Sequence, residues 1–141
     1  MSSTPFATEL ADLAPLAVAG PFAFAALLAT RLPFPFRRRN AELIAAAVAL
    51  LVGVLCVLLL RDALHTNGPV VSRIGGWEPR PGGTVVGINF AFDGLGAALA
   101  LLAAVLVGAA LLFSWRFFEA VGPTFHALML VFLGALTGFA L

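Results

Sequence analysis

Four long apolar runs, separated by polar segments, constrain this chain more than any other feature of its sequence. The runs cover residues 13–30, 41–60, 94–115 and 125–141. A helix of about twenty apolar residues spans the roughly 30 Å hydrocarbon core of a bilayer, and each run is close to that length. The first run contains Pro15 and the pair Gly20-Pro21, which membrane helices tolerate where neighbouring helices satisfy the freed backbone groups. The pattern predicts an all-α integral membrane protein with four transmembrane helices.

Composition excludes the other broad classes of protein. Of the 141 residues, 62% are hydrophobic and 11% are charged, whereas a soluble domain is about half apolar and a quarter charged. A globule of this size has too little interior to bury so much apolar surface. The formal net charge is only +1 and the chain has no basic tail. We therefore exclude a soluble domain, a disordered chain and a nucleic-acid-binding protein.

The placement of arginine predicts the orientation in the membrane. The cluster Arg37-Arg38-Arg39 directly precedes the second run, and the positive-inside rule places this short link, residues 31–40, in the cytoplasm. The segment of residues 61–93 is then extracytoplasmic. Residues 1–12 carry two acids and no lysine or arginine, which is not typical of a cleavable signal peptide, and they are predicted to form a short polar lead at the membrane interface.

The extracytoplasmic segment is the longest polar stretch of the chain. Residues 70–74 and 84–90 are rich in β-branched and aromatic residues, and glycine and proline are frequent in residues 75–83 between them. This pattern predicts a short β-hairpin between the second and third helices. The alternative is an irregular loop in which Trp77 lies at the membrane interface.

Ionisable side chains inside a bilayer are costly, so they are the first candidates for a functional site. No Asp, Glu, Lys or Arg lies in the middle third of any run, and of the ionisable residues at run ends we single out two as candidates. Asp93 precedes the third run and either caps that helix or attracts ions at the outer mouth of a pathway. His126 lies one residue into the fourth run and either relays protons or is an interfacial histidine satisfied by water or a carbonyl. We predict no catalytic residue, no metal site and no cofactor.

Small residues recur at a spacing of four in the last two runs. Such spacing lets helix backbones approach closely, as in GxxxG contacts, although an alanine-rich chain also produces it by chance. The predicted helix-packing positions are Gly96, Ala100, Ala104 and Gly108 in the third run, and Gly134 and Gly138 in the fourth. The lone Cys56 is expected to be a small packing residue.

Several segments together carry a family resemblance. They are residues 75–81 (GGWEPRP), 86–95 (VGINFAFDGL), 112–119 (LFSWRFFE) and 125–138 (FHALMLVFLGALTG). Through these segments the chain resembles the N-terminal part of the antiporter-like subunits of respiratory complex I and of Mrp-type Na+/H+ antiporters. In that family an outer β-hairpin enters the third helix through an Asp-Gly-Leu-Ser-like step. Here Gly96 stands in place of the serine, and the first two runs match only in number, length and orientation.

The resemblance implies a function for the whole assembly rather than for this chain alone. Family members carry an essential glutamate on the fifth helix and a lysine on a later one, and this sequence contains neither that helix nor any lysine. The chain is thus expected to be the N-terminal membrane piece of a proton- or cation-translocating subunit, not competent for transport alone. The resemblance implies a parent assembly that is NADH–quinone oxidoreductase-like or an antiporter, and we expect it in a bacterial plasma membrane. The expected partners are the lipid bilayer and either other membrane subunits or the remaining helices of the same subunit.

Two other functions stay open. One is a small non-catalytic membrane scaffold or assembly subunit that packs on a larger complex through its glycine-bearing helices. The other is a self-contained four-helix transporter or channel that works as a dimer. The second is disfavoured, because small multidrug exporters carry an essential glutamate in their first helix and the run of residues 13–30 contains no acid.

Overall fold

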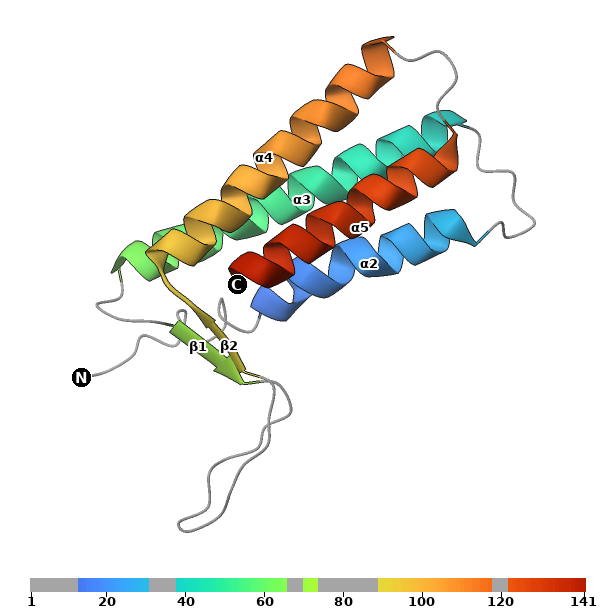
Figure 1. The fold of residues 1–141 in the computed structure, drawn as a ribbon. Coiled ribbons are helices and arrows are strands. Elements are labelled where there is room, and N and C mark those ends of the chain that lie inside the picture. The colour runs from blue at the N-terminus through green and yellow to red at the C-terminus, as the bar shows by residue number, and fades with distance from the viewer. Residues whose placement is uncertain (1–12, 31–37, 66–69, 74–88, 118–121) are drawn as a thin grey trace.

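In the described part of the chain, four helices form a bundle in which helices consecutive in sequence run antiparallel, with two short strands at one end (Figure 1). The computed structural model describes residues 13–30, 38–65, 70–73, 89–117 and 122–141. The elements are α2 (Ala14–Ala29), α3 (Arg38–His65), β1 (Val70–Arg73), β2 (Asn89–Phe92), α4 (Gly94–Phe117) and α5 (Pro123–Ala140). α3 packs along α4 and α2 packs along α5, and the two pairs meet through α4–α5, α2–α3 and α3–α5 contacts. This is the up-down-up-down arrangement of a four-helix bundle.

Three of the helices are long and apolar enough to cross a membrane. α3, α4 and α5 contain 28, 24 and 18 residues. α2 is apolar but has 16 residues, which corresponds to about 24 Å of helix. α3 extends beyond the predicted span of residues 41–60 at both ends, because a helix continues into the polar interface until a residue breaks it, and the first glycine and proline after α3 are Gly68 and Pro69.

Proline and glycine mark the ends of two helices. Pro15 occupies the first turn of α2 and Pro123 the first position of α5, where the missing N–H would have had no intrahelical partner. Gly122 precedes α5 in an extended conformation. Thr30 ends α2, and its hydroxyl donates to the carbonyls of Ala26 and Leu27 at 3.0 and 3.1 Å. These are local signals, so the bounds of α2 and α5 lie within two residues of the predicted runs.

The strands β1 and β2 pair antiparallel next to the start of α4. Val70 lies opposite Phe92, and Arg73 lies opposite Asn89. β2 overlaps the expected second strand, residues 84–90, only at its end, and it stops where Asp93 caps α4. The expected turn, residues 75–83, lies outside the described residues, as does the polar lead of residues 1–12. The complete hairpin therefore stays a prediction.

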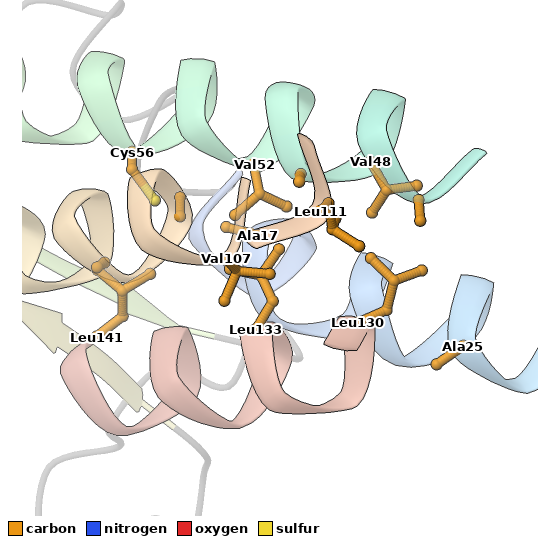
Figure 2. Close-up of a cluster of buried hydrophobic side chains, with 14 of the residues drawn as sticks. Ala17, Ala25, Val48, Val52, Cys56, Val107, Leu111, Leu130, Leu133 and Leu141 are labelled. Atoms are coloured by element: carbon orange, nitrogen blue, oxygen red, sulfur yellow. The ribbon is translucent and has the colours of Figure 1, made fainter. Parts of the chain in front are cut away.

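The core is built from small apolar side chains at spacings of three and four. In α4 the buried residues are Ala97, Ala100, Ala103, Ala104, Val107, Leu111 and Ser114. Figure 2 shows Val48, Val52 and Cys56 of α3 facing the same core as Leu130 and Leu133 of α5. This spacing places one stripe of each helix toward the bundle axis. Because alanine is the commonest residue in the stripe, the helix backbones lie close together.

Large apolar side chains also cover the outside of the bundle. Leu50 is 71% exposed, Leu95 is 69% exposed and Phe139 is 92% exposed. A helix in a water-soluble bundle has a polar outer face, whereas a helix that is apolar all round belongs inside a larger protein or a membrane. The outward leucines and phenylalanines of the bundle therefore indicate a lipid-facing surface.

Candidate functional site

Two glycines of α5 lie against α2 in the seam between these helices. A Cβ atom placed on Gly134 would lie 2.9 Å from Cε2 of the Phe22 ring, and one on Gly138 would lie 3.0 Å from Cγ1 of Val18. The two glycines stand four residues apart on α5, and their partners stand four residues apart on α2. The glycine pair thus faces another helix of the same chain, and the absent side chains leave the room that Phe22 and Val18 occupy.

The small-residue stripe of α4 divides into two parts. Ala100 and Ala104 are buried, and the Ala104 Cβ lies 3.9 Å from the Cβ position of Gly53 on α3. Gly96 lies against the end of α5, where an added Cβ would come within 2.5 Å of the Ala140 carbonyl oxygen. Around Gly108, by contrast, an added Cβ would meet nothing within 4 Å. The predicted stripe therefore contacts α3 and α5 in its first half and leaves Gly108 open.

Asp93 occupies the N-cap position of α4. Its Oδ1 accepts a hydrogen bond from the backbone N–H of Gly96 at 2.8 Å, and its backbone carbonyl accepts from Ala97 N–H at 3.0 Å. The carboxylate thus satisfies a free donor at the helix start and lies at the positive end of the helix dipole. Asp93 is exposed, so it remains accessible from solvent.

His126 lies in the first turn of α5 and is 2% exposed. Its Nδ1 is 3.3 Å from the Gly122 carbonyl oxygen, and its ring packs edge-on against Phe125 with a centroid distance of 5.5 Å. The Gly122 carbonyl is therefore within hydrogen-bonding distance of the His126 ring. The side chain is more buried than an interfacial position suggests, because His126 lies on the same buried face of α5 as Leu130.

The two ion-pathway candidates lie at opposite ends of the bundle, because α4 and α5, at whose starts they stand, begin at opposite ends (Figure 1). Gly96, next to Asp93, contacts Ala140 at the end of α5, whereas His126 lies at the beginning of that helix. Ala140 follows His126 by fourteen positions on α5, which separates the two sites by about 21 Å along the helix axis. The structure does not bring Asp93 and His126 together.

The arginines assigned to orientation lie partly outside the described residues. Arg37 is among the residues not described, and Arg38 begins α3. Arg39 and Arg116 are exposed and lie at the same end of the bundle, because α3 begins where α4 ends (Figure 1). β1 and β2 lie at the other end.

Two buried polar residues were missed by the sequence reasoning. Besides His126, the buried polar side chains of the described residues are Ser114 of α4 and Thr137 of α5, 2% and 0% exposed. Thr137 stands between Gly134 and Gly138 in the α2–α5 seam. A polar residue next to the predicted packing glycines was the available signal, since small hydroxyl residues often hydrogen-bond across membrane helices.

This arrangement supports helix packing better than it supports chemistry. Among the described residues, no three His, Cys, Asp or Glu side chains gather in a way that could hold a metal ion.

No family model matches the chain, and neither a curated protein nor a solved structure matches it.

Proposed function

We propose that this chain is a membrane module of an antiporter-like proton- or cation-translocating assembly of the complex I or Mrp type. It supplies packed helices and an outer cap and is not competent for transport alone. The resemblance of residues 75–141 to that family supports the choice of assembly. The interior of the bundle supports the passive role.

The composition of that interior is the observation that carries the proposal. Proton relay within a membrane uses ionisable side chains, and an ion path needs a polar lining. The buried side chains of the described helices are apolar except for Ser114, His126 and Thr137. A single histidine at one end of the bundle, about 21 Å from the opposite end, is not a relay.

The proposal includes a membrane placement. We take α2 as a fourth span, because its 16 residues cover about 24 Å and a bilayer thins locally around a short helix. The end that carries Arg39 and Arg116 then faces the cytoplasm of a bacterial cell. The end with β1 and β2 faces outward, where the paired strands cap the bundle.

The scaffold function remains the second candidate, in a modified form. Gly134 and Gly138 contact Val18 and Phe22 of the same chain, and Gly96 contacts Ala140. These glycines are therefore used within the bundle. A partner helix would have to pack elsewhere, for example near Gly108, where an added Cβ has open space.

Isolation of the native assembly tests the proposal. The tagged chain would be purified from the membranes of its own organism in a mild detergent and resolved on a native gel. We expect co-migration with antiporter-like helices that carry the glutamate and lysine of the transport pathway. Migration with a complex whose subunits lack such helices would favour the scaffold function instead. A G108L variant, which fills the open position on α4, would then show whether that surface holds the partner.

A further inference from the structure

A proline in the middle of α2 leaves one backbone carbonyl of that helix without its usual hydrogen-bond donor. Pro21 is buried inside the helix. Because proline has no N–H, the carbonyl four residues earlier, that of Ala17, loses its α-helical donor. An unsatisfied carbonyl in a membrane interior is costly, and neighbouring helices commonly supply the replacement donor.

Thr137 of α5 lies opposite this carbonyl. Its Oγ1 is 3.5 Å from the Ala17 oxygen, across 120 residues of sequence. The same hydroxyl lies 2.9 Å from the Leu133 carbonyl and 3.1 Å from the Gly134 carbonyl of its own helix. A hydroxyl carries one proton, so it makes one strong hydrogen bond at a time. In this structure the shorter bond is to its own helix, and the bond to Ala17 is long for an O–H···O contact.

The glycines that flank Thr137 hold α5 close to this part of α2. Gly138 lies against Val18, which directly follows Ala17, and Gly134 lies against the ring of Phe22, which directly follows Pro21. Rotation of the hydroxyl, with a closing of the seam by about 0.5–0.8 Å, would convert the long contact into a direct bond. Two acceptors are thus within reach of one donor at the point where α2 lacks a backbone hydrogen bond.

We propose that Thr137 is a latch for a hinge in α2 at Pro21. When the hydroxyl donates to Ala17, the break in the α2 ladder is closed and α2 is held straight against α5. When it donates to Leu133, the carbonyl of Ala17 is released and the part of α2 after Pro21 pivots. This conformational device does not depend on the proposed function of the chain.

A double-mutant cycle tests the hydrogen bond. T137V removes the hydroxyl, and P21A restores an N–H that serves the Ala17 carbonyl. With Pro21 present, we expect T137V to lower the folded-to-unfolded ratio in detergent about threefold, as removal of a typical interhelical hydrogen bond does in membranes. In the P21A background we expect T137V to have almost no effect, and T137S should behave like the wild type in both. Equal losses in both backgrounds would overturn the latch.

Thr30 provides the matched control for this cycle. Its hydroxyl makes the same pair of bonds to carbonyls three and four residues earlier, but at the exposed end of α2. We expect T30V to have the same small effect whether residue 21 is proline or alanine. A dependence of T30V on residue 21 as large as that of T137V would also overturn the proposal, because the coupling would then not be specific to the seam.

Spin-label distances test the hinge and do not require P21A to fold. In a C56A background, one label pair would stand at Ala29 and Leu128, beyond Pro21, and a second at Leu16 and Phe139, before it. All four side chains are exposed. We expect T137V to broaden the distance distribution of the first pair only. An unchanged first pair, or equal broadening of both, would rule out a hinge at Pro21.

Discussion

Asp93 combines two roles that substitution can separate, since its side chain both caps α4 and carries a charge. Asparagine caps a helix about as well as aspartate, so D93N should leave the free energy of unfolding nearly unchanged. D93A removes the acceptor of the Gly96 N–H and should lower that free energy by about 1 kcal/mol. Unfolding of the purified chain in detergent measures both. In an assembled parent complex, a transport defect of D93N as large as that of D93A would show that the charge attracts ions.

The glycines of α4 form a matched pair at the same scale. An alanine at Gly96 would bring its Cβ within 2.5 Å of the Ala140 carbonyl oxygen, a backbone atom that moves only with the end of α5. We expect G96A to lower the free energy of unfolding by roughly 1–3 kcal/mol, as overpacking typically does. G108A enters open space on the same helix and should stay within about 0.5 kcal/mol of the wild type. Equal effects of the two variants would contradict the contact between α4 and α5.

At the scale of a helix, labelling the two ends of α3 measures the orientation of the bundle in the membrane. Asn40 and His65 are exposed at its two ends, and Cys56 is buried between them. In a C56A background, we expect N40C to resist an impermeant maleimide in intact cells and to react after the membrane is permeabilised. H65C should react in intact cells. The reverse pattern would place the arginine-rich end outside and contradict the orientation.

At the scale of the whole molecule, we predict that the chain alone conducts no protons or other ions. In liposomes with an imposed pH gradient, the purified chain should dissipate the gradient no faster than protein-free liposomes. The reason is the interior, where the buried polar side chains of the described helices are Ser114, His126 and Thr137. A leak above the protein-free rate that H126A abolishes would contradict this prediction and assign a proton path through the histidine.

Much of the helical architecture was predictable, because a bilayer makes each segment satisfy its backbone hydrogen bonds locally. The apolar runs therefore predicted the positions of α2, α3, α4 and α5. Asp93 indicated the start of α4, because a capping side chain bonds a backbone N–H only three residues later, here that of Gly96. Local chemistry also accounts for the prolines that begin α2 and α5. The membership of the antiporter-like family, by contrast, stays a prediction.

Only the tertiary structure decided which faces of these helices meet. Gly96 and Gly108 are equivalent in an alanine-rich run, yet one touches the end of α5 and the other touches nothing within 4 Å. The pairing of α2 with α5 brings Thr137 to the carbonyl of Ala17, 120 residues away. Helix formation depends on contacts within one turn and can be inferred from local sequence. The choice of packing face depends on the shapes of all four helices together. Small apolar residues occur on every side of these helices, so the sequence of one helix does not indicate which side packs.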